Sequence, residues 1–285
     1  MPDQPRTVFI TGCSSGIGYQ AARRLPGAGF RVIASARKPS DVNRLREEGM
    51  ECILLDLDVP ESIGAAVQEL EQRTGGRLWG LFNNAGFGQP GALEDLSREA
   101  LRAQFETNVF GTLDLTRRLL PWMRTAGEGR IVQNSSVLGL VSLAYRGAYN
   151  ASKYALEGLY DTLRLELAGS GVHAVLIEPG PIRSRFREHA HAAFRRNIKA
   201  EHSVHRERYR LIEARLAQPG QVAPFTLPAD AVVDKLLHAL TARCPAPRYY
   251  VTFPTWLFGT LRRLLGSRAL DRVLLHVSRK EWEDP

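Results

Sequence analysis

Thr11-Gly12-Cys13-Ser14-Ser15-Gly16-Ile17-Gly18 follows Arg6-Thr7-Val8-Phe9-Ile10, a run that begins basic and turns apolar and β-branched. The run predicts a short buried strand, and residues 16–25 predict a helix that Pro26 ends early. Glycines at such a junction let the backbone turn tightly and let a phosphate approach bare N–H groups. A tight turn alone is the alternative. The α/β pattern that follows favours phosphate binding, although Gly-x-x-x-Gly-x-Gly differs from the usual dinucleotide-binding spacing.

Strand-like and helix-like runs alternate along most of the chain. We expect strands at residues 8–11, 31–36, 51–56, 78–83, 130–134, 173–178 and 248–252. Helices are expected between them, at residues 16–25, 41–48, 60–73, 98–123, 148–168 and 229–241. Alternation of this kind predicts an α/β fold, a doubly wound parallel sheet of about seven strands with helices on both faces.

The alternation loosens after Glu178. Residues 183–218 are polar, basic and rich in His and Arg, and they predict an inserted helical flap over about 183–228. Residues 256–277 predict an amphipathic, basic helix or pair of helices within a tail at 253–285. No repeat, low-complexity tract or linker separates a second unit, so we expect a single domain over 1–285 with its core at 6–252.

Composition narrows the class of protein. The 285 residues are 44% apolar and 24% charged, which is typical of an ordinary globular chain. The formal net charge is +8, yet the arginines are scattered and no run of five basic residues occurs, so we expect no nucleic-acid partner. An anionic cofactor or an anionic membrane surface explains the charge equally well.

Three cysteines, Cys13, Cys52 and Cys244, are far apart and lack metal-ligand spacing. They predict free thiols in a reducing compartment, and we expect no metal site. Met1 leads into a polar stretch and then the first strand, which predicts no signal peptide. The chain has no apolar stretch of about 18 residues, so no transmembrane helix is expected. We expect a cytoplasmic protein, with peripheral membrane contact as an alternative.

Tyr149-Asn150-Ala151-Ser152-Lys153 places a tyrosine four residues before a lysine. On a helix this spacing puts both side chains on one face. A tyrosine is too weak an acid to exchange protons near neutral pH, but a fixed cation beside it favours the phenolate and lowers its pKa. Tyr149 is therefore a candidate general acid/base and Lys153 the residue that tunes it. A surface Tyr–Lys pair, common on helices, is the alternative.

Two further motifs complete a pattern. Asn83-Asn84-Ala85-Gly86 follows the fourth expected strand, and Pro179-Gly180-Pro181-Ile182 follows the sixth. With the glycine run and the Tyr–Lys pair, the chain resembles the short-chain dehydrogenase/reductase family over about residues 6–252. The detailed match resembles the branch of 17β-hydroxysteroid and retinol dehydrogenases and bacterial NADP-dependent aldehyde reductases. The resemblance implies a Rossmann-like sheet, and we expect a homodimer or homotetramer.

The resemblance implies two further active-site residues. The family's serine lies thirteen positions before its tyrosine, which is Ser136 rather than its neighbour Ser135. Ser136 would hold the substrate carbonyl oxygen near Tyr149, and its alternative role is to cap the next turn. Asn108 matches the position that holds a water linking Lys153 to solvent. Its alternative is a mid-helix Asn bonded to the backbone.

The end of the second strand indicates the cofactor. NAD enzymes place an acid there for the ribose 2′-hydroxyl, whereas this chain has Ala36, Arg37 and Lys38. Arg37 can pair with a 2′-phosphate, which favours NADP(H) over NAD(H); a solvated loop arginine is the alternative. The resemblance implies contacts from Asp58 to the adenine, from Asn84 and Gly86 to the ribose, and from Ile182 to the carboxamide. The full expected set is Gly12, Ser14, Ser15, Gly16, Ile17, Gly18, Arg37, Lys38, Asp58, Val59, Asn84, Ala85, Gly86, Tyr149, Lys153, Pro179, Gly180, Ile182 and Ser184.

These features favour an NADP(H)-dependent reductase of an aldehyde or ketone, in which the cofactor carries hydride and Tyr149 the proton. The alternatives are oxidation of a secondary alcohol such as a hydroxysteroid or retinol, and a regulatory protein that binds cofactor without turnover. Regulators usually lose the tyrosine or lysine, whereas this chain keeps Asn108, Ser136, Tyr149 and Lys153. A pocket for a hydrophobic carbonyl is expected from Phe87, Leu138, Leu140, Leu143, Phe186 and Phe194.

Apolar residues recur at helical spacing in the tail, with arginines interleaved. They are Trp256, Leu257, Phe258, Leu261, Leu264 and Leu265, with Arg262, Arg263, Arg268 and Arg272. Such a helix can lie on an anionic membrane surface. The same stripe can instead pack on the domain or on a second subunit, and we favour this reading.

Overall fold

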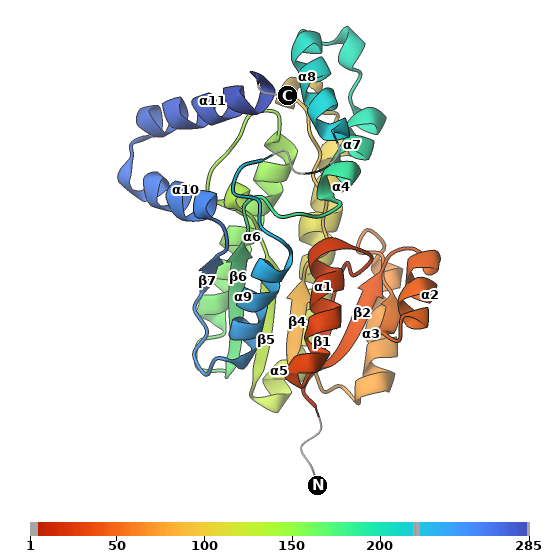
Figure 1. The fold of residues 1–285 in the computed structure, drawn as a ribbon. Coiled ribbons are helices and arrows are strands. Elements are labelled where there is room, and N and C mark those ends of the chain that lie inside the picture. The colour runs from red at the N-terminus through yellow and green to blue at the C-terminus, as the bar shows by residue number, and fades with distance from the viewer. Residues whose placement is uncertain (1–4, 219, 221–222, 284–285) are drawn as a thin grey trace.

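A computed structural model describes residues 5–218, 220 and 223–283. Seven strands form one parallel sheet in the order β3-β2-β1-β4-β5-β6-β7 (Figure 1). The predicted parallel sheet of about seven strands is confirmed. The strands are β1 (Thr7–Ile10), β2 (Arg31–Ala36), β3 (Glu51–Leu54), β4 (Gly80–Asn83), β5 (Gly129–Asn134), β6 (Val172–Glu178) and β7 (Arg248–Tyr250).

Helices cover both faces of this sheet because successive strand residues point to opposite sides. Val8 and Ile10 pack with α1 (Gly16–Arg24), α2 (Pro39–Glu47) and α9 (Asp230–Thr241). Phe9, between them, packs on the other face with α3 (Pro60–Thr74), α5 (Thr112–Ala126) and α6 (Gly147–Glu166). The chain therefore buries two apolar layers, one on each side of strands that are apolar on both faces.

The order of the strands positions the site. From β1 the chain winds outward through β2 to β3, then returns to β4 and winds the other way. The connections after β1 and β4 therefore leave the sheet in opposite directions. In such sheets a crevice forms outside the carboxyl ends of these two strands, and ligands bind there.

The predicted helix at 98–123 is interrupted. The structure has α4 (Arg98–Phe105), a π-helical segment over Glu106–Gly111, and then α5. The π-helical segment carries Asn108, which bonds sideways to the chain after β4. Gly111 lies so close to Leu57 that a Cβ would be 2.0 Å from the Leu57 oxygen. Wide turns of this kind are frequent at functional sites, and apolar periodicity does not reveal them.

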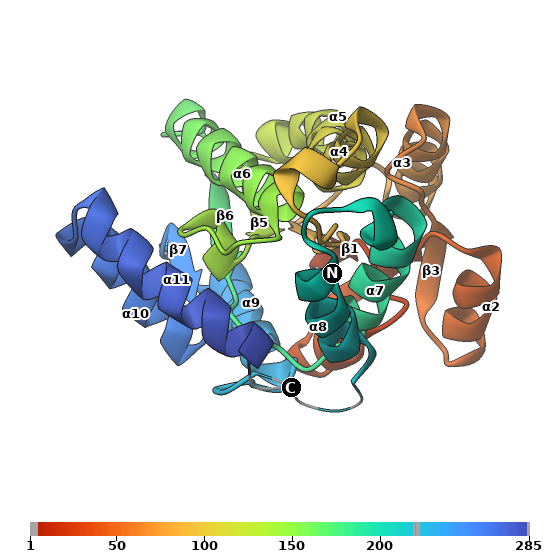
Figure 2. The same ribbon diagram turned by 90° about the horizontal axis from the view of Figure 1, so that it is seen from above.

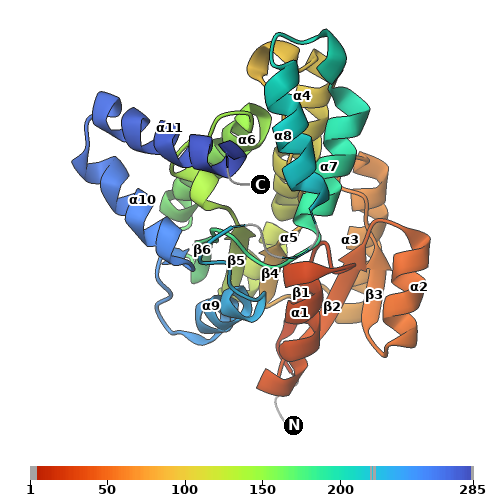
Figure 3. The ribbon, with the colours of Figure 1, turned by 45° about the horizontal axis from the view of Figure 1, so that its top comes forward.

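The predicted flap and tail are both helical. The flap contains α7 (Phe186–Asn197) and α8 (Arg206–Ala217), and the tail is a pair of helices, α10 (Phe253–Leu264) and α11 (Ser267–Glu283). Figures 2 and 3 show flap and tail on opposite sides above the carboxyl ends of the strands, where α11 comes into contact with α8. In the described parts of the chain, no helix combines the length and apolarity needed to cross a membrane.

Candidate active site and cofactor site

The loops after β1 and β4 are bonded to each other at the crevice. The Thr11 hydroxyl accepts hydrogen bonds from the main-chain N–H groups of Asn84 and Ala85, both at 3.0 Å. The Asn84 amide donates to the Gly12 oxygen at 3.2 Å. Gly12 has φ +71°, and a Cβ there would lie 2.8 Å from the Ala85 Cα. The glycine is needed both for its backbone conformation and for this close approach.

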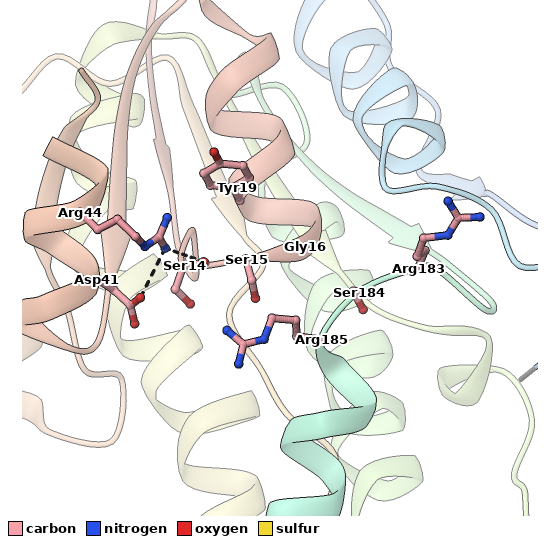
Figure 4. A pocket seen from close by; sticks show the side chains of 9 residues that line it. All are labelled: Ser14, Ser15, Gly16, Tyr19, Asp41, Arg44, Arg183, Ser184 and Arg185. Carbon is pink, nitrogen blue, oxygen red and sulfur yellow. Dashed lines mark hydrogen bonds and ion pairs between the residues drawn. The ribbon is translucent and has the colours of Figure 1, made fainter. Parts of the chain in front are cut away.

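A pocket of about 550 Å³ opens where the glycine loop enters α1 (Figure 4). Gly16 has φ +60°, and a Cβ there would lie 3.0 Å from the Ser184 Cβ, so the loop after β6 can approach. The start of α1 has no side-chain cap, which leaves its first N–H groups facing the pocket without a side-chain partner. These groups fit a phosphate. The lining residues are Ser14, Ser15, Gly16, Tyr19, Asp41, Arg44, Arg183, Ser184 and Arg185.

Cationic groups gather around this pocket. Burial lowers the pKa of His189 on α7, and the charges of Arg185, Arg37 and Lys38 lower it further against the opposing charge of Glu188, so these three cations lie close enough to act on His189. Arg44 donates to the Ser14 oxygen at 2.8 Å and pairs with Asp41 at 3.4 Å (Figure 4). The pocket therefore combines bare N–H groups with positive charge, which is the chemistry that a nucleotide phosphate requires.

The remaining expected cofactor residues lie on the same edge of the sheet. The Asp58 carboxylate accepts a 2.5 Å hydrogen bond from Thr107, and Val59 is exposed beside it. Pro179 accepts from the Val137 N–H at 2.8 Å, which ties the loop after β6 to the loop after β5. A Cβ on Gly180 would lie 2.2 Å from the Thr252 hydroxyl oxygen. Ile182 forms a parallel bridge to Leu227.

The four predicted catalytic residues come together from three elements. Tyr149 and Lys153 lie on α6, and a side-chain hydrogen bond joins Tyr149 to Ser136, which follows β5. The Lys153 Nζ lies 5.6 Å from the centre of the Tyr149 ring and donates to the Asn134 oxygen at 2.8 Å. The Asn108 amide donates to Ser152 on α6 at 3.1 Å.

Burial sets the protonation of this pair. It raises the pKa of Tyr149 to about 12, against the opposing effects of the Ser136 hydrogen bond and the Arg146 charge. It lowers the pKa of Lys153 to about 8, against the opposing charge of Glu157. Desolvation is the largest influence on the pKa of Tyr149. The phenol is therefore protonated at neutral pH and able to donate. That Lys153 lowers this pKa in the working enzyme remains a prediction.

The structure shows the alternative, structural roles of Ser136 and Asn108. Ser136 accepts from the Leu138 N–H at 3.1 Å and so caps the short turn after β5. Asn108 donates to the Phe87 oxygen and accepts from its N–H, each at 3.1 Å. Ser135 is directed elsewhere, since its hydroxyl donates to Glu157 at 2.5 Å. Of the two serines, Ser136 is the one that reaches the tyrosine.

Of the residues expected to line the substrate pocket, Phe186 lies directly against Tyr149. Its ring centre is 5.3 Å from that of Tyr149, and its side chain is 39% exposed. Gly88, which the sequence analysis missed, lies beneath both rings: a Cβ there would be 2.8 Å from the Phe186 Cζ and 3.5 Å from the Tyr149 Cδ2. The available signal was its place at the end of Phe-Asn-Asn-Ala-Gly-Phe-Gly.

The other expected pocket residues are less exposed. Leu138 is buried, Leu140 accepts hydrogen bonds through its main-chain oxygen from Tyr154 and Arg262, and Leu143 packs towards the tail helices. Phe194 is only 2% exposed and packs on Tyr209 in the core shared by α7 and α8. Its role in the structure is to hold the flap together, because it has almost no surface left to offer a substrate.

Comparison with known proteins agrees with this site. A family profile described as short chain dehydrogenase matches residues 6–194, and the chain belongs to this family. It is 47% identical over 269 residues to the uncharacterized oxidoreductase YbbO of Escherichia coli, covering 94% of each chain. The chain is thus an oxidoreductase that acts on alcohol or carbonyl groups with a nicotinamide cofactor.

Two more distant relatives differ in their named activities. An NADPH-dependent 3-dehydrocapnine reductase of Ornithobacterium rhinotracheale is 32% identical over 279 residues, covering 94% of this chain and 95% of that protein. A 17-beta-hydroxysteroid dehydrogenase type 6 of Bos taurus is 33% identical over 293 residues, covering 99% of this chain and 90% of that protein. The resemblance to the hydroxysteroid dehydrogenase branch is therefore confirmed.

Proposed function

We propose that this protein is an NADP(H)-dependent reductase of a hydrophobic aldehyde or ketone. The observation that carries the proposal is the half-buried Tyr149, which is hydrogen-bonded to Ser136 and lies against the partly exposed ring of Phe186. A neutral phenol beside a second hydroxyl is suited to bind and protonate a carbonyl oxygen. The alternative, a cofactor-binding protein without turnover, needs none of this preorganisation.

The chain's residues divide the work of reduction. Ser136 and Tyr149 hydrogen-bond the carbonyl oxygen and orient it, and the phenolic proton passes to that oxygen as the alkoxide forms. The bound nicotinamide supplies the hydride to the carbonyl carbon. The ammonium of Lys153 stabilises the phenolate left behind, and a water held at Asn108 returns a proton from solvent. Lys153 is itself held by the Asn134 oxygen.

Charge supports the choice of NADP(H). Ala36 places no acid at the end of β2, so nothing there repels a 2′-phosphate. Arg37 and Lys38 follow it, and Arg185 and His189 approach from the flap. The 32%-identical reductase of Ornithobacterium rhinotracheale is NADPH-dependent by name. A doubly charged phosphate would be favoured by this cluster and would gain charge-assisted hydrogen bonds from Arg37.

The reverse reaction is the second candidate. The likeness to a protein of Bos taurus that is named a hydroxysteroid dehydrogenase, at 33% identity, supports oxidation of a secondary alcohol as this candidate. Oxidation needs the phenolate as a base, and the raised pKa of Tyr149 works against that form. An NADP(H)-dependent enzyme in a reducing compartment usually works in the direction of reduction, and for this reason we favour reduction.

The screening experiment uses purified protein with NADPH or NADH against decanal, retinal and a ketosteroid, followed at 340 nm. We expect NADPH oxidation with at least one hydrophobic carbonyl, and a lower kcat/KM with NADH. Tyr149→Phe serves as the matched blank. NADPH binding without turnover of any of the three, together with turnover of the corresponding alcohols by NADP⁺, would favour the dehydrogenase instead.

We also propose that helix α10 of the tail packs on the domain with one face and contacts an anionic membrane with the other. Phe258 and Leu261 of α10 pack with Leu274 of α11 and Val141 beside the site, as expected for packing on the domain. Trp256, 59% exposed, and Leu264, 76% exposed, face outward. α10 has no acidic residue and ends in Arg262 and Arg263. Aromatic and basic residues together suit an anionic membrane surface.

The free thiols support a place in the cytoplasm. Cys13, Cys52 and Cys244 are all unpaired, as predicted, and such thiols persist where the environment is reducing. We propose a cytoplasmic homodimer or homotetramer that contacts the membrane from its surface.

A further inference from the structure

A cluster of charged side chains lies beneath the catalytic residues and has no part in the roles assigned above. Arg248 on β7 pairs with Glu157 on α6 and donates to Glu178 on β6 at 2.7 Å. Its other terminal nitrogen donates to Asp161, one turn further along α6, at 2.5 Å. One guanidinium therefore joins three carboxyl groups from two elements, and all of them lie against the end of the sheet that bears the site.

Glu157 connects this cluster to the loop that carries Ser136. Its carboxylate accepts a 2.5 Å hydrogen bond from the Ser135 hydroxyl. At the other end of the loop, a Cβ on Gly139 would be 2.9 Å from the Glu157 Cγ, so the loop rests on this side chain. Ser135 and Gly139 bracket Ser136, and Glu157 supports both.

Glu157 also lies one turn from Lys153 on the same face of α6. Both side chains are buried, and the Glu157 charge acts on Lys153 to favour the ammonium form. The hydrogen bond that the Lys153 ammonium donates goes to a neutral carbonyl, that of Asn134. A buried ammonium needs a negative partner to remain charged, and Glu157 is the group that supplies it.

Glu178 differs from the other two carboxyl groups of the cluster. Glu178 is 0% exposed, and its Oε2 has no hydrogen-bond partner among the described residues. Burial, and next the charge of Glu157, raise the pKa of Glu178 to about 8, so it is mostly protonated at neutral pH. That leaves the carboxylates of Glu157 and Asp161 against the cations of Arg248 and Lys153, and Arg164 also pairs with Asp161 at 2.5 Å.

We propose that Glu157 is a positioning residue of the active site: it is the counter-ion of Lys153 and the support of the Ser136 loop, and Arg248 holds it in place. The proposal rests on the proposed function for the roles of Lys153 and Ser136. It assigns to Glu157 no contact with substrate or cofactor. Its effect passes through the charge of the lysine and the position of the serine.

Other charged groups face Lys153 or its neighbours and could shift its titration. On α6 they are Tyr149, which is neutral below pH 12, and Asp161, which lies two turns away. From β6 and β7 they are Glu178 and Arg248, which reach Lys153 through Glu157. From the start of α6, Arg146 acts on Tyr149. Asn108, from the π-helical segment, carries no charge. The matched comparison is therefore between Glu157 and Asp161.

The test measures the lysine in the protein without cofactor. The ¹³Cε resonance of Lys153, assigned by its loss in Lys153→Arg, is titrated in wild type, Glu157→Gln and Asp161→Asn. Glutamine keeps an oxygen for Ser135 but removes the charge. We expect the titration midpoint to fall by about one pH unit or more in Glu157→Gln, since an opposite charge at close range shifts a pKa by roughly 1–3 units. Asp161→Asn, which removes a 39% exposed partner of the same arginine, should leave it in place.

A second arm measures catalysis. With NADPH and the best carbonyl from the screen, the alkaline limb of the kcat profile should move to lower pH in Glu157→Gln and stay in place in Asp161→Asn. Glu157→Asp should restore part of the shift. If Glu157→Gln does not fold, Ser135→Ala tests the loop support alone, with an expected fall in kcat and an unchanged Kd for NADPH.

The outcomes separate this proposal from the proposed function. An unchanged lysine midpoint in folded Glu157→Gln, or an equal shift in Asp161→Asn, overturns the role of Glu157 whatever the enzyme does. If the lysine midpoint shifts in Glu157→Gln but the wild-type protein reduces no carbonyl, the role of Glu157 as counter-ion of Lys153 stands and the proposed reductase function is wrong.

Discussion

The ammonium of Lys153 donates a 2.8 Å hydrogen bond to the main-chain oxygen of Asn134, so helix α6 is fastened to the end of strand β5. Ser136 leaves the same strand end two residues later and meets Tyr149 one turn before the lysine. The distance between the serine and the tyrosine is thus set by rigid elements. Catalytic groups held in this way lose little freedom when a substrate binds.

Cofactor preference should follow the charge at the end of β2. We expect Arg37→Gln to lower kcat/KM with NADPH by about tenfold or more, because a charge-assisted bond to phosphate is lost. Adding Ala36→Asp should swing the preference towards NADH, since an acid repels a 2′-phosphate and binds a 2′-hydroxyl. Arg117→Gln, at an exposed site on α5, is the control. A wild-type enzyme that uses NADH better than NADPH would refute the assignment.

Gly88 should limit what can occupy the space over Tyr149. In Gly88→Ala the new Cβ would lie 2.8 Å from the Phe186 Cζ, and the phenylalanine must move. We expect kcat/KM for a bulky carbonyl to fall on the order of tenfold, with the Kd for NADPH unchanged, because the reacting carbon is displaced. Gly27→Ala, where a Cβ meets nothing within 4 Å, is the control. Equal kinetics in the two variants would mean that Phe186 does not border the substrate.

The pH dependence of stability should reveal the titration of the Glu178 carboxyl group. Its pKa is raised to about 8 in the folded protein, so the folded state holds a proton that the unfolded chain releases near pH 4.5. This group therefore makes folding less favourable as the pH rises between these values. Glu178→Gln removes the titration. The difference in Tm, variant minus wild type, should grow from pH 5 to pH 9, and a constant difference would contradict the assignment.

The outward face of α10 should bind anionic vesicles. Full-length protein is expected to sediment with phosphatidylglycerol liposomes at low salt and to be released by high salt, because arginines supply part of the attraction. Trp256→Ser together with Leu264→Ser should reduce sedimentation, whereas Val204→Ser, an exposed apolar site in the flap, should not. Protein that stays in the supernatant at low salt would contradict membrane binding and would favour packing of the outward face of α10 on a second subunit.

Local patterns in the sequence were enough to predict the sheet, the two helical insertions and a tyrosine and a lysine one turn apart on a helix, whereas the roles of Ser136 and Asn108 were implied by the resemblance to the family and remain predictions. Each depends on neighbours in the chain: strand periodicity, a glycine turn, or Tyr and Lys one helical turn apart. The features that the sequence did not predict depend on residues that are far apart in the chain and come into contact only in the folded protein. The pKa of Tyr149 is governed by burial, and Arg248 reaches Glu157 across 91 positions. Phe194 has the composition of a pocket residue, but its partner is Tyr209 of the next helix.

Transfer of deuterium from NADPH that carries deuterium at both C4 positions tests the central claim most directly. Wild type and Tyr149→Phe are each incubated with labelled NADPH and a carbonyl that the screen identifies, such as decanal, and the alcohol is analysed by mass spectrometry. We predict one deuterium at the carbinol carbon with wild type. Tyr149→Phe should bind NADPH with the same Kd and lose about 10²–10⁴ in rate, the usual contribution of a general acid. Alcohol without deuterium, or a phenylalanine variant within about tenfold of wild type, would contradict the account.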